Sequence, residues 1–244
     1  MLERDQRGRL EVRTDMKNKV LTFSYDDGVS QDIRLIELLD KYGMKATFNL
    51  NSEFLGKDWT LTREGVVVAH NKIKPEDVRS VYGAHEVAAH TLTHPLLTGV
   101  ADDNEIIRQV EQDRLALSEL CGYEVVGFAY PGGGINYDSR VANIIRENTG
   151  IRYCRTTVSN HSFDVQNDLY EFKPSVYHHA EWDKLFELGD QFLSAKADTQ
   201  KVFYVWGHSY EFDIHNTWDR FEEFLRMMSG REDIAYLTNK DALL

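Results

Sequence analysis

The chain has few cysteines and no long apolar run. Its two cysteines, Cys121 and Cys154, form neither a CxxC pair nor a disulfide framework, so we expect reduced, buried and inert thiols. No stretch approaches the ~20 apolar residues of a membrane-spanning helix, so no membrane partner is expected. The first residues, MLERDQRGRLEVRTDMKNK, lack the apolar core of a signal peptide. These absences predict a cytoplasmic protein.

The chain also lacks excess positive charge and linker-like composition. Its formal charge of −12 disfavours a nucleic-acid partner, because such partners need a basic surface. The acidic residues are scattered, as is typical of a solvated face. There is no repeat, low-complexity tract or Pro/Gly/Ser-rich linker. A length of 244 residues is usual for one α/β barrel, so residues 1–244 are expected to form a single domain.

Strand-like and helix-like segments alternate along the chain. The apolar patterns predict strands at 20–24, 46–50, 86–89, 125–130, 153–157, 202–206 and 235–237, and helices at 29–42, 75–81, 102–121, 138–149, 182–194 and 217–228. Residues 52–74 are irregular, with a possible hairpin that turns near residues 63–65. Repeated βα units predict a mostly parallel sheet, whose active site would lie at the carboxyl ends of the strands.

Two short motifs carry candidate chemistry. TFSYDDG (22–28) ends a strand-like run with Asp26 and Asp27, and HTLTH (90–94) places His90 and His94 four residues apart. Either motif alone has an ordinary explanation, since DDG is a common turn and HxxxH a common chance pair. Together they offer one carboxylate and two imidazoles as ligands of a metal with open positions, and a second carboxylate as a base. This combination predicts a hydrolytic metal site.

Five segments resemble the motifs of one family in the family's order. TFSYDDG resembles the TFDDG motif of the polysaccharide deacetylases, which are nodulation-deacetylase-like carbohydrate esterases, and YGAHEVAAHTLTHPLLT (82–98) resembles their GHEIGNHTxTHPxLT. KATFNLNSEFLG (45–56), FAYPGGG (128–134) and FYVWGH (203–208) are similar to the second-strand, third and fifth motifs. The resemblance covers roughly residues 18–240. It implies an α/β fold, a distorted (β/α) barrel with about seven strands.

The resemblance also implies roles for the paired motifs. Asp27, His90 and His94 match the family's metal ligands, and Asp26 matches its catalytic base. The implied cofactor is a divalent metal ion such as Zn²⁺, which would polarise the acetyl carbonyl and acidify a water.

The third and fifth motifs imply the remaining groups. His208 matches the general acid, and the backbone N–H of Gly132 would stabilise the oxyanion. Ala129 stands where the family carries an arginine that orients the base. We hypothesise that Arg155, on the next strand, takes that place; the alternative is an ordinary solvated arginine. The fourth motif is not evident, and Asp164 is a weak candidate for it.

The other histidines fall outside these motifs. His85 matches a family position that is not a ligand, so we interpret it as structural. His178 and His179 follow a strand-like run and are interpreted as a surface pair. Trp206 could belong to the core or contact a sugar ring. Three histidines have no candidate partners in the sequence: His70, His161 and His215.

These observations predict a metal-dependent hydrolase that removes an N-acetyl or O-acetyl group from a carbohydrate. The expected substrate is an acetylated oligosaccharide or small glycan. An amidohydrolase of a non-sugar C–N bond, of the cyclic imide or ureide type, stays open because of Ala129. A catalytically inactive glycan-binding protein is the other alternative. The segment 52–82 could shape either the pocket or an interface.

Overall fold

The computed structural model describes residues 2–4, 10–12 and 17–244. A central sheet contains β3 (Lys19–Asp26), β4 (Ala46–Leu50), β7 (Glu86–Ala89), β8 (Gly127–Ala129), β9 (Tyr153–Arg155), β10 (Val176–Tyr177), β11 (Lys201–Gly207) and β12 (Ile234–Tyr236). The order is β10-β11-β3-β4-β7-β8-β9, with β12 beside β3, and every pairing in this sheet is parallel. Seven of the strands form a curled half-barrel, which confirms the predicted α/β barrel fold.

Strand β3 lies at the centre of the sheet. Its run of β-branched and aromatic residues is buried along its whole length, as expected for a strand covered on both faces. One edge of β3 pairs with β11, and the other edge is shared by β12 at residues 19–21 and β4 at residues 23–26. Because the strands are parallel, all of their carboxyl ends lie along the same edge of the sheet.

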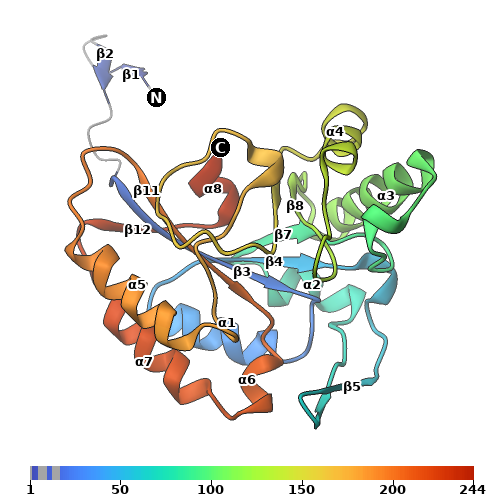
Figure 1. Cartoon of the computed structure of the whole chain (residues 1–244), viewed down its shortest axis with the longest axis horizontal. Helices are drawn as coiled ribbons and strands as arrows, with labels where there is room; N and C mark the ends of the chain where they lie inside the picture. The colour runs from blue at the N-terminus through green and yellow to red at the C-terminus, as the bar shows by residue number, and fades with distance from the viewer. Residues whose placement is uncertain (1, 5–9, 13–16) are drawn as a thin grey trace.

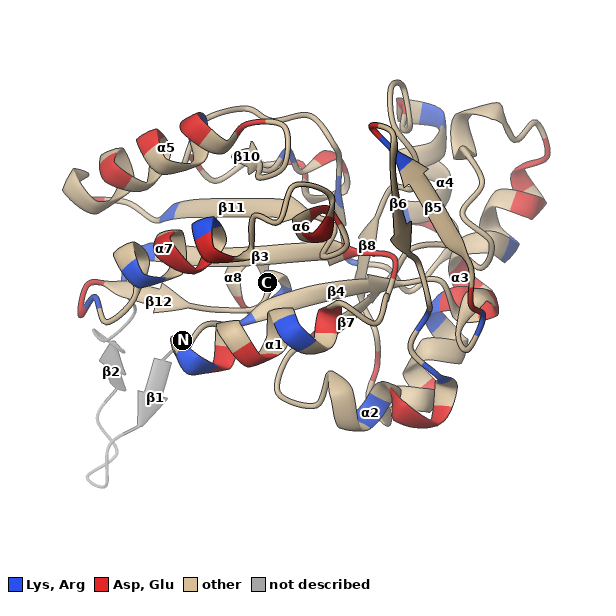
Figure 2. Cartoon of the chain, turned by 90° about the horizontal axis from the view of Figure 1, so that it is seen from below, with Lys and Arg blue, Asp and Glu red and all other residues tan. Residues whose placement is uncertain are grey.

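Helices cover the sheet (Figure 1). They are α1 (Asp32–Lys41), α2 (Val78–Val81), α3 (Asp103–Cys121), α4 (Ser139–Asn148), α5 (Trp182–Ser194), α6 (Glu211–Ile214), α7 (Trp218–Met228) and α8 (Asn239–Leu243). Short 3₁₀ turns span η1 (Ser52–Phe54), η2 (Pro75–Asp77), η3 (Leu97–Gly99) and η4 (Leu169–Glu171). Figure 2 shows acidic and basic residues spread over the helices while the sheet has few, as predicted for a solvated acidic surface.

Two antiparallel pairs lie outside the central sheet. Strands β1 (Leu2–Arg4) and β2 (Leu10–Val12) pair with each other. Strands β5 (Thr60–Arg63) and β6 (Val66–Ala69) form the hairpin anticipated in the irregular segment, with Glu64 and Gly65 at its turn. Both turn residues have positive φ, 52° and 79°, as a two-residue hairpin turn requires. Figure 1 shows this hairpin projecting from the body of the protein.

The sequence prediction located all the longer elements and missed some of the short ones. Helices α6 and α8 were not predicted, and β10 was indicated only as the strand-like run before His178, because two to five residues carry too little periodicity. Cys121 and Cys154 are free and buried, as expected, and burial raises the pKa of both thiols. Within the described residues, no helix combines the length and apolar character needed to cross a membrane.

Candidate active site

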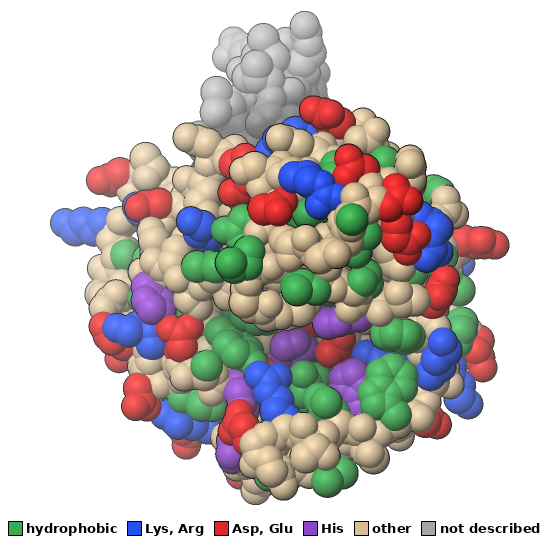
Figure 3. All heavy atoms as spheres, turned by 45° about the vertical axis from the view of Figure 1, so that its right-hand side comes forward, with side chains coloured by type: hydrophobic (Ala, Val, Ile, Leu, Met, Phe, Trp, Pro, Cys, Tyr) green, Lys and Arg blue, Asp and Glu red, His purple; other side chains and the backbone are tan. Residues whose placement is uncertain are grey.

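The candidate groups gather at the carboxyl edge of the sheet. Asp26 ends β3, His90 follows β7 and His208 follows β11. They line a cavity of about 400 Å³, whose lining is Asp26, Asp27, Arg63, His90, His94, Gly132, Gly133, Gly134, Thr157, Tyr177, Trp206, His208 and Tyr210. Figure 3 shows histidine and acidic side chains in a hollow on this face. Parallel strand topology thus unites residues as distant in the sequence as Asp26 and His208, which are 182 positions apart.

Asp27, His90 and His94 form a three-residue cluster. One ligand atom from each lies within 4.8 Å of the others, and His94 Nε2 is 3.9 Å from Asp27 Oδ1. Burial lowers the pKa of His90 to about 4, so its imidazole is neutral near pH 7. His90 Nδ1 lies 2.7 Å from the Ala129 carbonyl oxygen, which suits an Nδ1–H donor and leaves the Nε2 lone pair free. This donor set fits a divalent metal ion.

The backbone at these ligands is held in an uncommon conformation. Asp27, Thr91 and His94 have φ values of 85°, 69° and 57°, in the region that non-glycine residues rarely adopt. The Asn51 amide donates to the His90 and Thr91 carbonyl oxygens at 2.6 and 2.9 Å. Asp113 of α3 accepts the His90 backbone N–H at 2.9 Å. Buried hydrogen bonds therefore hold the ligand loop in place.

Asp26 forms a buried ion pair with Arg155. Arg155 Nη2 donates to Asp26 Oδ1 at 2.7 Å and to Oδ2 at 2.5 Å, and Asn49 Nδ2 donates to Oδ1 at 2.8 Å. Arg155 is completely buried, and its guanidinium lies 4.4 Å from the centre of the Trp206 ring. The predicted contact therefore exists, and the alternative of a solvated arginine is wrong.

The register of β8 and β9 explains how the arginine reaches Asp26. Ala129 and Arg155 are paired neighbours on these two strands. A guanidinium from β9 can therefore occupy the space that a side chain from β8 would otherwise fill. Trp206 both packs in the core, at 5% exposure, and lines the cavity.

His208 is aligned by Glu211, three residues further on. His208 Nδ1 lies 3.0 Å from Glu211 Oε1, while His208 Nε2 is 4.0 Å from Asp27 Oδ2. Burial alone would lower the pKa of His208, but the Glu211 carboxylate outweighs it and the pKa is raised. Glu211 itself is buried, and despite burial its pKa is lowered to about 2 by His208, His178 and Arg63. Nδ1 thus faces Glu211, while Nε2 lies on the side of Asp27 and the cavity.

The segment 52–82 shapes the pocket. Arg63 of β5 lies 2.7 Å from Glu211 Oε1 and donates to the Tyr177 hydroxyl at 2.7 Å. Just after β6, His70 Nε2 lies 3.3 Å from Asp27 Oδ2, and Lys72 Nζ donates to the Asp27 carbonyl oxygen at 2.5 Å.

These groups set the charge of Asp27. Burial would raise the pKa of Asp27, but Lys72, His70, His208 and His94 together hold it well below its usual range. Sequence reasoning missed His70, Lys72 and Arg63 because no motif surrounds them. The i, i+3 spacing of His208 and Glu211 was the available signal for Glu211.

Gly132 lies in a tight loop on the cavity wall. Its φ of 80° suits glycine, and the buried Asn136 amide donates to the Gly132 and Tyr130 carbonyl oxygens at 3.1 and 3.0 Å. The loop thereby borders the cavity beside the candidate metal ligands.

Several sequence interpretations were wrong. Asp164 is exposed and pairs with Lys201 at 2.5 Å, away from the cavity lining. His178 is not a surface residue but completely buried. Its ring packs against Phe212, and its Nε2 lies 3.1 Å from Glu211 Oε2. His70 and His215 do have partners, and His161 pairs with Glu181 at 2.5 Å.

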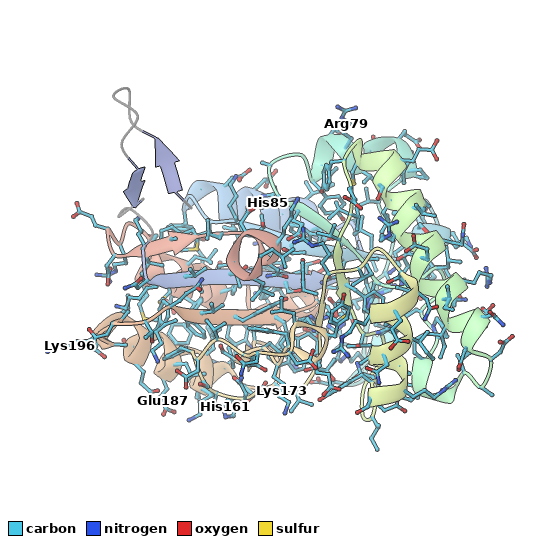
Figure 4. The ribbon with its side chains drawn as sticks, turned by 90° about the horizontal axis from the view of Figure 1, so that it is seen from above. Arg79, His85, His161, Lys173, Glu187 and Lys196 are labelled. Carbon is cyan, nitrogen blue, oxygen red and sulfur yellow. The ribbon has the colours of Figure 1, made fainter. Side chains whose placement is uncertain are left out.

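His85, which Figure 4 labels, fits its structural interpretation. Its Nδ1 accepts the Ala46 N–H at 3.2 Å, and its Nε2 lies 3.4 Å from Asp40 of α1, outside the cavity.

Comparison with solved structures shows the same fold. A putative polysaccharide deacetylase from Mycobacterium smegmatis is 16% identical, with a TM-score of 0.66, 99% of this chain covered and 93% of that one. A family 4 carbohydrate esterase from Streptomyces lividans in complex with acetate is 15% identical, with a TM-score of 0.57 and coverage of 90% and 92%. The D285S mutant of the peptidoglycan deacetylase PdaC from Bacillus subtilis is 16% identical, with a TM-score of 0.54 and coverage of 92% and 89%.

Sequence comparison gives the family. No curated protein sequence matches the chain. A family model described as polysaccharide deacetylase matches residues 13–154, more than half of the chain, including the two carboxylates at the end of β3 and the two histidines after β7. The chain therefore belongs to the polysaccharide deacetylase family.

Proposed function

We propose that this protein is a metal-dependent hydrolase that removes an acetyl group from an oligosaccharide or small glycan. The observation that carries the proposal is the buried Asp26–Arg155 pair beside the Asp27, His90 and His94 cluster. In this arrangement the Asp26 carboxylate, as a base, lies next to three side chains that could bind a divalent ion. Family membership supports carbohydrate deacetylation as the reaction class.

In this proposal, different residues serve as metal ligands, general base and general acid. When bound by Asp27, His90 and His94, a Zn²⁺-like ion supplies Lewis acidity toward the acetyl carbonyl and the attacking water. Asp26 accepts a proton from that water as its oxygen attacks the carbonyl carbon. Arg155 and Asn49 donate hydrogen bonds to Asp26 and hold its carboxylate in a fixed orientation.

The opposite side of the cavity completes the reaction. The Gly132 N–H donates to the developing oxyanion. His208 Nε2–H gives its proton to the leaving nitrogen or oxygen, so that acetate and a free amine or hydroxyl are released. Glu211 keeps His208 protonated at Nδ1 and stabilises the cationic form that donates from Nε2.

The cavity wall supports a sugar as the substrate. Its volume of about 400 Å³ lies in the range of small-molecule sites. Tyr177 and Trp206 stack with ring centres 4.3 Å apart, and Tyr210 lies on the same wall. Such aromatic groups offer both an apolar face and a polar tip to a carbohydrate.

The non-sugar alternative rested on one departure from the family pattern. An amidohydrolase stayed open because Ala129 replaces an orienting arginine, and Arg155 contacts Asp26 in its stead. This contact and the family membership favour the carbohydrate deacetylase, which we propose.

The test is acetate release from a panel of N-acetylglucosamine oligomers and O-acetylated glycans. The protein is stripped of metal and assayed with and without added divalent ions. We expect metal-dependent release that falls by roughly 10²–10⁴-fold in Asp26→Asn, the usual contribution of a general base. Sugar binding without acetate release from any substrate would instead identify a glycan-binding protein.

A further inference from the structure

A second group of metal-ligand side chains lies outside the catalytic cavity. It consists of Glu64 at the turn of the β5–β6 hairpin, His179 just after β10, and His215 just after α6. Glu64 Oε1 lies 2.8 Å from His179 Nε2, and Glu64 Oε2 lies 2.7 Å from His215 Nε2. His179 and His215 follow Glu64 by 115 and 151 residues in the sequence, yet both contact its carboxylate.

The arrangement has the chemistry of a cation site. Zn²⁺ binds imidazole nitrogen and carboxylate oxygen at about 2.0–2.2 Å, so ligand atoms around one ion are roughly 3.3 Å apart. Here one atom from each of the three side chains lies within 4.8 Å of the others, so small side-chain rotations bring them to that spacing. Both histidines present Nε2, and the two rings are nearly parallel, with centres 5.7 Å apart.

The placement of the three groups also favours a cation. Glu64 presents a different carboxylate oxygen to each histidine, and each histidine faces it through Nε2. His179 is only 5% exposed at its side chain and is pre-positioned, while Glu64 and His215 are half exposed and open to solvent.

We propose that Glu64, His179 and His215 bind a second divalent transition-metal ion of the Zn²⁺ class. Two imidazoles and one carboxylate are a known zinc donor set, and the nitrogen ligands disfavour Mg²⁺ and Ca²⁺, which prefer oxygen. The proposal is independent of the catalytic function, because none of the three residues lines the cavity.

The ion would fasten the hairpin over the cavity. Arg63 precedes Glu64 and reaches the Tyr177 hydroxyl and Glu211 inside the pocket. A metal bridge at the adjacent residue fixes the hairpin to the segments after β10 and α6. The predicted consequence is a hairpin that opens less often when the ion is bound.

The test is the stoichiometry of Zn²⁺ binding to metal-free protein, measured by calorimetric titration at neutral pH. We expect two ions for the wild type, one for His215→Ala, one for Asp27→Ala and none for the double variant. His215→Ala should weaken the second ion by at least the ~10–100-fold that loss of an outer partner costs. The matched control is His161→Ala, since His161, labelled in Figure 4, is an exposed histidine paired with one glutamate, and it should still bind two ions.

A second measurement distinguishes a metal bridge from a hydrogen-bonded cluster. Amide hydrogen exchange in residues 60–69 should slow when Zn²⁺ is added to Asp27→Ala, which keeps only the second site, and should not change in the double variant. Two results would overturn the proposal: a single wild-type ion that His215→Ala retains, or hairpin exchange indifferent to Zn²⁺. Because Asp27→Ala removes the catalytic ion alone, failure of this proposal is distinguishable from failure of the proposed function.

Discussion

At the residue scale, each candidate catalytic or metal-binding side chain is oriented by one close partner. Arg155 holds Asp26, the Ala129 carbonyl orients His90, and Glu211 orients His208. Each partner is buried, so each interaction acts in a medium of low dielectric where charges interact strongly. The chemistry of the site therefore depends as much on these partners as on the groups themselves.

Replacing Arg155 with methionine should leave Asp26 as a buried carboxylate without a cation. Breaking a buried pair from one side typically costs about 3–5 kcal/mol, so we expect a lower free energy of unfolding. Acetate release should fall by roughly 10²-fold or more, since the base loses its orientation. Arg155→Lys, which keeps the charge, should lose less of both. The control is the exposed Arg152, whose change to methionine should alter neither denaturant unfolding nor kcat/KM.

Replacing Glu211 with glutamine should shift the pH dependence of the reaction. The general acid must be protonated, so activity falls as pH rises through the pKa of His208. Since Glu211 raises that pKa, Glu211→Gln should move the alkaline limb of the kcat/KM profile to lower pH. Glu181→Gln, which removes the partner of His161 instead, should leave the profile in place. An alkaline limb that does not move would remove His208 from the acid role.

At the scale of elements, polar contacts from strand ends and helix ends hold the site's scaffold together. Asp32, in the first turn of α1, accepts hydrogen bonds from Tyr82 at 2.7 Å and from Ser209 at 2.6 Å. It thereby joins α1 to the end of α2 and to the residue after His208. Asp32 is completely buried, and burial raises its pKa to about 7.

This buried carboxyl predicts a pH-dependent stability. The pKa of Asp32 is about 7 in the folded protein and near 4 in the unfolded chain, so the folded state binds the proton more tightly. By linkage, this difference in pKa contributes up to about 4 kcal/mol to the free energy of unfolding. The contribution is present below about pH 4 and is lost as pH rises toward 7. Asp32→Asn should therefore gain stability relative to the wild type as pH rises over that range, measured by urea unfolding. Glu37→Gln, an exposed change on the same helix, should show a difference independent of pH.

At the scale of the whole molecule, the parallel half-barrel brings distant segments to one edge. The base, the metal ligands and the acid come from three different strand ends, so the site exists only in the folded chain. An ion bound there stabilises the folded state by mass action, because the unfolded chain offers no assembled site.

Metal removal should therefore lower both activity and stability. We expect a chelator to abolish acetate release and added Zn²⁺ to restore it. At 100 times its dissociation constant, an ion bound only by the folded state adds about 2.7 kcal/mol to the free energy of unfolding. The measurement uses His215→Ala, so that only the catalytic site contributes, with Asp27→Ala in the same background as the control that should show no gain. Equal stabilisation of both variants would place the ion elsewhere.

The sequence by itself determined the alternation of strands and helices, and hence the barrel class. It also determined the candidate ligands and base, because motifs such as TFSYDDG keep their chemical groups within a few residues of a strand end. Only the tertiary structure decided that Arg155 reaches Asp26, that His178 is buried, and that the hairpin supplies Arg63 to the cavity. Those contacts depend on strand register and on loops that cross between elements. Periodicity records which face of an element is apolar but carries no information about which distant side chain will lie against it.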